Sequence, residues 1–147
     1  METQRIQSYI LVAVQFLCAV FFFYFVGAAP LTLIPVIMIT AAIAIALWAI
    51  LTMRVGNITV SPIPKEEAKL VMSGPYVFIR HPMYAAVLIA MLGIAINIDS
   101  PLGYSVWVIL LLDLLIKMKF EEKLLLGKFP EYEQYLKRTK RVLPWIW

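Results

Sequence analysis

The eleven residues GPYVFIRHPMY, from Gly74 to Tyr84, form the densest polar stretch of the sequence and stand at the start of a hydrophobic segment. They bring together the only His of the chain, an Arg, two Tyr and two Pro. Taken one by one, they are explained by a snorkelling Arg, interfacial Tyr rings and a satisfied His. Taken as a cluster at a membrane entrance, where charged groups are costly, they indicate a functional site.

Arg80 and His81 directly precede Pro82, which can open a helix. The residue before a Pro favours extended backbone, so we expect His81 in the N-cap region of that helix rather than inside it. A helix N-terminus attracts anionic groups, and Arg80 adds a permanent charge with a fork of donors. The Gly74-Pro75 pair predicts a turn just upstream, where a Gly lets the backbone come close to a ligand.

Two adjacent carboxylates, Glu121 and Glu122, follow the last hydrophobic segment. Neighbouring side chains on a helix point about 100° apart, so at most one of the two readily faces a shared pocket. Alone, the pair is explained by a solvated helix surface with Lys117 or Lys119 as partners. The pair becomes a candidate for a functional site because the chain topology places it on the same side of the membrane as Arg80.

Aromatic residues dominate the tail of the chain. Phe129, Tyr132 and Tyr135 are spaced by three, so the two Tyr share a helix face. That face is equally suited to covering an aromatic ligand and to lying in the lipid headgroup zone. Trp145 and Trp147 have the character of interfacial anchors.

Hydrophobic residues make up 63% of the 147-residue chain, whereas soluble domains contain about 45–50%. We therefore expect an all-α, polytopic membrane protein that forms a single membrane-embedded domain over residues 1–147. It would have four transmembrane helices plus cytoplasmic C-terminal helices. A helical span needs about 20 residues, and four stretches come near this length, at about 8–28, 31–53, 82–98 and 102–118.

The first two predicted spans are separated only by Ala29 and Pro30, which predicts a tight helical hairpin. Pro30 suits the first turn of the second helix, and Pro35 is a candidate kink. The third span is short, about 26 Å at 1.5 Å per residue, and is expected to lean on its polar flanks. Turn-forming residues from Asn97 to Gly103 separate it from the fourth span, which continues as a charged helix from Lys117 to Lys128.

All 13 Lys and Arg residues lie in the N-terminal tail, in the central segment 54–80, or from Lys117 onward. An even number of spans puts these places on one side, and the positive-inside rule makes that side the cytoplasm. Both termini, Arg80 and the Glu pair are then expected at the cytoplasmic face, and the central segment is expected to fold against the membrane. Anionic lipid of the inner leaflet explains the basic residues, so no nucleic acid partner is implied.

Three features follow one another along the chain: GPYVFIRHPMY, a Glu-Glu pair beyond the next span, and an aromatic tail that ends in basic residues and Leu143-Pro144. Together they resemble the isoprenylcysteine carboxyl methyltransferase family, whose wider group includes the phospholipid N-methyltransferases. The likeness covers about residues 64–144. It implies an integral membrane enzyme that uses S-adenosylmethionine and acts on a lipophilic acceptor, either a carboxylate or an amine of a lipid or prenyl-like molecule.

In that family the cofactor pocket lies on the cytoplasmic side, between the segment around RHP and the helix that carries the Glu pair. Carried over, the resemblance implies a cofactor-binding set of Gly74, Pro75, Tyr76, His81, Tyr84, Glu121, Glu122, Tyr132 and Tyr135. It implies a catalytic set of Arg80, His81, Glu121 and Glu122, with no metal. Arg80 or the helix N-terminus would hold the carboxylate of the cofactor, a Glu would accept from its ammonium or ribose hydroxyls, and the Tyr pair would form a lid.

A carboxylate acceptor would need no general base, whereas an amine would, with a Glu, His81 or Asp113 as the candidate. Two other functions stay open. Membrane sterol or double-bond reductases carry a similar C-terminal half and use a nicotinamide cofactor, but the tail shows no clear phosphate cradle. A small four-span transporter would need an ionisable residue within the bilayer, where Asp113 alone is suited and a local pair with Lys117 explains it equally well.

Overall fold

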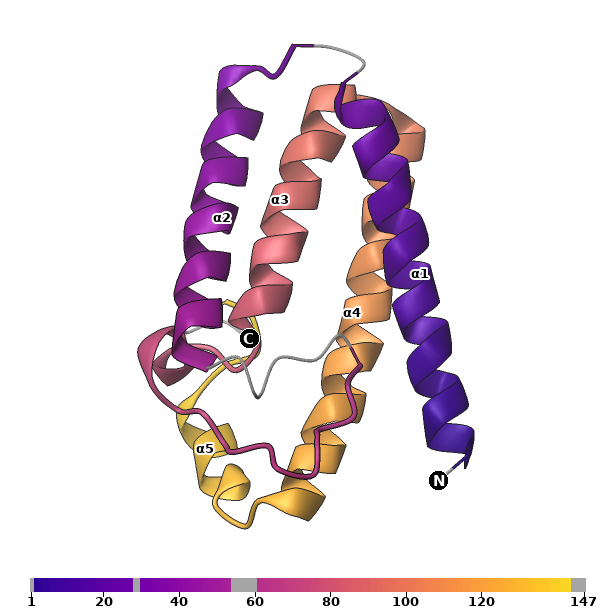
Figure 1. Cartoon of the computed structure of the whole chain (residues 1–147). Helices are drawn as coiled ribbons and strands as arrows, with labels where there is room; N and C mark the ends of the chain where they lie inside the picture. Colours follow the sequence, from indigo (N-terminus) through magenta and orange to yellow (C-terminus); the bar gives the residue numbers. More distant parts are fainter. Residues whose placement is uncertain (1, 28–29, 54–60, 144–147) are drawn as a thin grey trace.

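The computed structural model describes residues 2–27, 30–53 and 61–143 of the chain. The described part is all-α, as predicted, and contains no strand beyond one isolated parallel bridge between Ile79 and Lys140. Its elements in chain order are α1 (Glu2–Val26), α2 (Leu33–Met53), the short 3-10 helix η2 (Gly74–Val77), α3 (Pro82–Ile98), α4 (Pro101–Lys128) and α5 (Tyr132–Arg138) (Figure 1).

Three of the described helices, α1, α2 and α4, are long and apolar enough to cross a membrane. The helix α3 is apolar as well, but it has 17 residues and its bounds are those predicted for the third span. The charged continuation of the fourth span is also confirmed, because α4 is one helix of 28 residues through Lys128. The chain is an integral membrane protein, and the full count of four spans stays a prediction.

The predicted tight hairpin of the first two spans is wrong. The helix α2 packs on α3, whereas α1 packs on α4 and α3, so that α3 and α4 lie between the first two helices (Figure 1). A small residue explains the close fit of α2, because a Cβ added at Gly93 would lie 3.1 Å from the Met38 Cβ. On the other flank, Phe22 of α1 is fully buried.

The ends of the first two helices also differ from the prediction. Because α1 ends at Val26 and α2 begins at Leu33, Pro30 precedes the second helix instead of opening it. Pro35 lies within the first turn of α2, where backbone amides have no partner inside the helix in any case, so the residue falls outside the interior where a Pro forces a kink. Several residues named above lie outside the described part of the chain: Ala29, Pro144, Trp145 and Trp147.

The turn between α3 and α4 forms where it was predicted. Asp99 ends α3 in the left-handed conformation with φ 45°, and the Ser100 side chain caps α4 by accepting from the Gly103 amide at 3.0 Å. Gly103 therefore lies in the first turn of α4 rather than in the connection. At the same end of the bundle the Asn97 side chain accepts from the Thr32 amide at 3.1 Å, which ties α3 to the start of α2.

At the opposite end of the bundle, the chain before α3 pairs with the chain after α5. The Arg80 amide donates to the Lys140 carbonyl at 2.8 Å, and the His81 amide donates to the Arg141 carbonyl at 3.0 Å. Figure 1 shows α5, the end of α4, the end of α2 and the start of α3 gathered at this end. The described part of the central segment runs across it, where Ser61 is hydrogen-bonded to Ser8 of α1 at 2.8 Å.

Candidate active site

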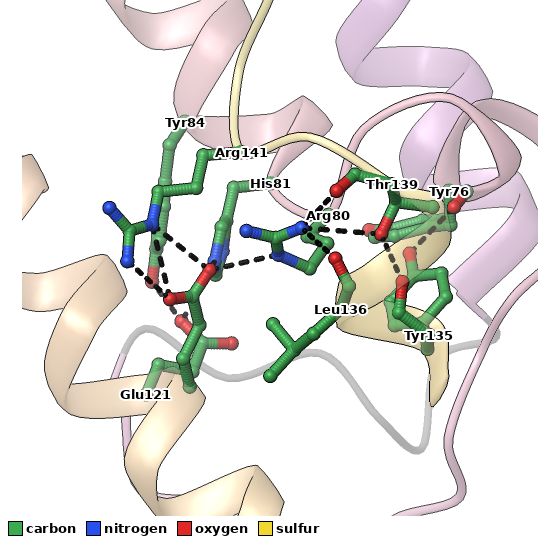
Figure 2. A network of polar contacts seen from close by, with 10 residues as sticks. Tyr76, Arg80, His81, Tyr84, Glu121, Tyr135, Leu136, Thr139 and Arg141 are labelled. Atoms are coloured by element: carbon green, nitrogen blue, oxygen red, sulfur yellow. Dashed lines mark hydrogen bonds and ion pairs between the residues drawn. The ribbon is translucent and has the colours of Figure 1, made fainter. Parts of the chain in front are cut away.

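The fold brings the predicted site residues together at that end of the bundle, although they come from three separate parts of the chain. His81 is the N-cap residue of α3, as predicted, and Glu121 lies near the end of α4. Tyr132 and Tyr135 come from α5. Figure 2 shows the side chains of His81, Tyr84 and Glu121 on one side of Arg80 and that of Tyr135 on the other. The Arg141 guanidinium in the same view bonds Glu122.

The carboxylate of Glu122 is the centre of a buried ion-pair network. It accepts from Arg80 Nε at 2.9 Å and from Arg141 Nη2 at 2.9 Å, and the Arg141 Nε lies 3.1 Å from the same Oε2 atom. Its side chain is 8% exposed, and a charge so far from water requires partners of this kind. Glu122 thus fastens α4 to the start of α3 and to the segment after α5.

The Arg80 guanidinium donates hydrogen bonds to protein acceptors on two sides. Besides Glu122, its guanidinium donates through Nη1 to the Leu136 carbonyl at 3.3 Å and to the backbone carbonyl of Thr139. The side chain is 9% exposed and lines the wall of a cleft. These contacts hold the Arg80 side chain in place, and its role in binding the carboxylate of a cofactor stays a prediction.

Glu121 has a different environment from its neighbour. It accepts a hydrogen bond from the Tyr84 hydroxyl at 2.8 Å, and its side chain is 25% exposed. The His81 ring stacks on the Tyr84 ring with centroids 5.4 Å apart and an angle of 11°. The two carboxylates flank this imidazole, because Nδ1 lies 4.0 Å from Glu121 and Nε2 lies 3.4 Å from Glu122. The buried Nε2 atom has no hydrogen-bond partner among the described residues.

These side chains border a cleft of about 90 Å³ between α4, α5 and the central segment. Its polar lining includes Arg80, His81 and Glu121, and its apolar lining includes Leu125 and Phe129. Glu121 lines this cleft, whereas Glu122 is directed into the ion-pair network, in agreement with the expectation that one carboxylate of the pair faces a pocket. A smaller adjoining pocket extends from the cleft toward Tyr84.

Three Tyr side chains form the aromatic wall of the cleft. The Tyr135 hydroxyl donates to the Tyr76 carbonyl at 2.6 Å, which fastens α5 to η2. The buried Tyr132 hydroxyl has no hydrogen-bond partner among the described residues. Burial raises the pKa of Tyr76, Tyr132 and Tyr135 well above the usual tyrosine value, so all three hydroxyls are neutral donors at physiological pH.

Gly74 and Pro75, predicted to line a cofactor pocket, are absent from the lining of the cleft. Gly74 has φ 58°, and a Cβ added there would lie 2.5 Å from Thr52 Oγ1 of α2. The close approach that requires a Gly is therefore to a helix of the protein. Pro75 is buried beside it, so this turn seats the cleft wall on α2.

Sequence reasoning missed the roles of Arg141 and Thr139. Arg141 supplies half of the charge around Glu122, and Thr139 gives Arg80 a carbonyl acceptor. The basic tail signalled a cation near the site, but its pairing depends on contacts across the fold. Asp113 and Lys117 attract each other, as the sequence suggested, but without a short ion pair among the described residues. The Lys117 ammonium donates to Gln15 of α1 at 2.6 Å.

Comparison with known proteins agrees with the resemblance drawn from the sequence. A family model described as phospholipid methyltransferase matches residues 30–131, which include α2, α3, α4 and the predicted site from Gly74 to Glu122. The cobalt-zinc-cadmium resistance protein CzcN of Cupriavidus metallidurans is 34% identical over 82 residues, which are 54% of this chain and 38% of that relative. The chain thus spans well under half the length of the curated relative that it matches. Among the described residues, no group of three or more His, Cys, Asp or Glu side chains is placed to hold a metal ion.

Proposed function

Because the chain belongs to the phospholipid methyltransferase family, we propose that it is an integral membrane enzyme that uses S-adenosylmethionine to methylate a lipophilic acceptor, the carboxylate or amine of a lipid or prenyl-like molecule. The observation that carries this proposal is the cleft beside Glu121, where a partly exposed carboxylate and the His81 ring meet an aromatic wall. The Tyr132 hydroxyl of that wall has no hydrogen-bond partner among the described residues.

The residues around the cleft fit the groups of this cofactor. Glu121 would accept from its ammonium or from ribose hydroxyls, and the neutral Tyr132 hydroxyl and His81 supply further hydrogen bonds. The faces of the Tyr rings attract a positive sulfonium. When bound, the cofactor supplies an activated methyl group, and the task of the protein is to align it with the acceptor and exclude water.

The ion-pair network of Glu122, Arg80 and Arg141 would serve this task indirectly. It holds α4, the start of α3 and the segment after α5 at fixed distances. The first two of these parts carry Glu121 and His81 of the cleft wall. The cleft of about 90 Å³ is well below the roughly 300 Å³ at which small-molecule pockets begin, so we expect α5 to move outward to admit the cofactor. Tyr132 and Tyr135 would then act as a lid.

We further propose that residues 1–147 form one methyltransferase domain with four membrane spans. The helix α3 is about 26 Å long at 1.5 Å per residue, which is close to the hydrocarbon thickness of a bilayer. Four crossings place both chain ends and the cleft on one side, and the distribution of Lys and Arg makes that side the cytoplasm.

Ligand binding to the purified protein in detergent tests the cofactor assignment. S-adenosylhomocysteine should bind saturably, and His81→Ala and Glu121→Gln should each abolish the binding. Glu133→Gln is the matched control, because Glu133 is an exposed residue of α5 that is paired only at the surface with Lys137. Binding of NADPH in place of S-adenosylhomocysteine would overturn the proposal in favour of the reductase alternative.

The acceptor requires a second experiment. Membranes that contain the protein are incubated with methyl-labelled S-adenosylmethionine and native lipid extract, and the labelled product is separated and identified. Label in an ester that is released by mild alkali identifies a carboxylate acceptor, whereas alkali-stable label identifies an amine. Absence of lipid label with a protein that binds S-adenosylhomocysteine would contradict the lipophilic acceptor.

A further inference from the structure

A second cavity, of about 300 Å³, lies among the membrane-spanning helices. Most of its wall comes from α2 and α3, where Ala42 and Ala46 on one helix and Ala86 and Ala90 on the other leave space through their small side chains. Ile43 also borders the cavity and is 54% exposed on the surface of the bundle, so the cavity meets the face that the lipid would cover. A cavity of about 300 Å³ accommodates part of one hydrocarbon chain, and its opening to the lipid face leaves the remainder of the chain outside.

One end of this apolar cavity is polar, because Lys117 and Gln15 line it. Lys117 is 1% exposed, and its ammonium donates to the Gln15 side-chain oxygen at 2.6 Å. It also lies 5.3 Å from the centre of the Tyr84 ring. No carboxylate of the described residues is within ion-pair distance of this ammonium. Asp113 and Glu121 attract this ammonium only from longer range. Its short contacts are an amide and a ring, so it is suited to receive an anion from outside the chain.

The position of this ammonium relates the cavity to the cleft. Met83 and Tyr84 line the cavity, and the same two residues line the small pocket that adjoins Glu121 and His81. Since the Tyr84 hydroxyl is bonded to Glu121 while its ring faces Lys117, one aromatic ring separates the two spaces. A head group held at Lys117 would therefore lie next to the proposed cofactor site.

We propose that Lys117 and Gln15 bind the carboxylate head group of a single-chain lipid whose hydrocarbon chain occupies the cavity between α2 and α3. That this lipid is the methyl acceptor rests on the proposed function, whereas its binding does not. An amine head group would meet the Lys117 ammonium as a like charge, so the cavity disfavours amine acceptors. Lys117 is then the residue that selects a carboxylate acceptor.

Photolabelling with a diazirine analogue of palmitate, on the full chain in nanodiscs at neutral pH, tests this proposal. The label should attach to α2 and α3, and palmitate should compete for it about tenfold better than hexadecylamine does. Lys117→Met should lower the labelling about tenfold, because the charge-assisted contact is lost. Lys119→Met is the matched control, since Lys119 is exposed on the same helix, and it should leave the labelling unchanged.

Ala46→Leu gives a second variant that fills the cavity and leaves the ammonium in place, and it should also lower the labelling. Helical circular dichroism and gel-filtration elution show whether each variant is folded. Equal competition by hexadecylamine, or unchanged labelling of folded Lys117→Met, overturns the proposal. Stronger competition by hexadecyl phosphate overturns the choice of a carboxylate. Binding of S-adenosylhomocysteine, measured on the same samples, should be unaffected by Lys117→Met, so a failure of the cofactor assignment is detected separately.

Discussion

Two buried charges on α4 have opposite surroundings. Glu122 is enclosed by the guanidinium groups of Arg80 and Arg141, whereas Lys117, little more than one turn earlier, contacts an amide oxygen and an aromatic ring. Both residues are nearly inaccessible to solvent, at 6% and 1% exposure. The comparison teaches that burial alone does not reveal the role of a charge. A charge with close ion-pair partners holds elements of the fold together, whereas one without them is, on the proposal above, open to a ligand.

The largest expected effect is on stability at the Glu122 network. Glu122→Ala leaves two guanidinium groups without their shared carboxylate and should lower the free energy of unfolding by about 3–5 kcal/mol. Reversible unfolding in mixed micelles measures the change. The control is Glu133→Ala, whose exposed pair with Lys137 should contribute no more than about 0.5 kcal/mol. Equal losses in the two variants would remove the distinction between the Glu122 network and a surface pair.

A smaller loss of stability is expected at Gly74, where the turn before α3 packs against α2. Gly74→Ala combines a left-handed backbone with a Cβ 2.5 Å from Thr52 Oγ1, and should lower stability by about 1–3 kcal/mol. Gly127→Ala is the matched substitution, because a Cβ there meets nothing within 4 Å and the residue is helical, so it should raise stability by up to about 1 kcal/mol. Thermal unfolding of the two variants should move in opposite directions, and parallel shifts would contradict the close contact with α2.

Lys117 should give the opposite result to Glu122. Lys117→Met removes a buried cation that forms no short ion pair among the described residues. The change also removes one hydrogen bond to Gln15, and it should alter stability by less than about 1 kcal/mol. The same unfolding measurement in mixed micelles applies. A loss as large as that of Glu122→Ala would show that Lys117 is part of the structural framework.

The smallest effect at neutral pH is expected at Tyr132. Its hydroxyl has no partner among the described residues, so Tyr132→Phe should change stability by less than about 0.5 kcal/mol at pH 7. Burial raises the folded-state pKa of this Tyr above the ordinary value of 10.0, so the protonated form stabilises the fold below that pH and the stability is lost as pH rises above it. The alkaline loss should therefore be smaller in Tyr132→Phe. Identical unfolding curves above pH 10 for both proteins would contradict the buried position of the hydroxyl.

The sequence predicted best the elements that are bounded by strong local signals. Pro82 and the turn after Asn97 fix the ends of α3, and the charged residues beyond Lys117 extend α4 as a helix. The neighbours of α1 and α2 were not predictable, because helices that are apolar on all sides carry no polar face to show which side packs.

The sequence predicted which residues gather at one end of the bundle better than it predicted which of them contact one another. Topology alone placed His81 and Glu121 at one end, because an out-and-back crossing returns the chain to the same side. The partners of Glu122 and Lys117 depend on tertiary packing, since Gln15 is 102 residues from Lys117. A pattern of local spacing finds the attraction between Asp113 and Lys117, but it cannot find the hydrogen bond that the Lys117 ammonium donates to Gln15.

The pairing of the chain before α3 with the segment after α5 has a consequence for the order of folding. Arg80 and its acceptor Thr139 are 59 residues apart, and the helices between them must pack before the two chain segments can pair. The membrane bundle can thus assemble while the cleft is still unformed. A substitution in the tail segment would then yield a protein that inserts normally and retains its helices but lacks the cleft, so correct insertion by itself does not show that the cleft has formed.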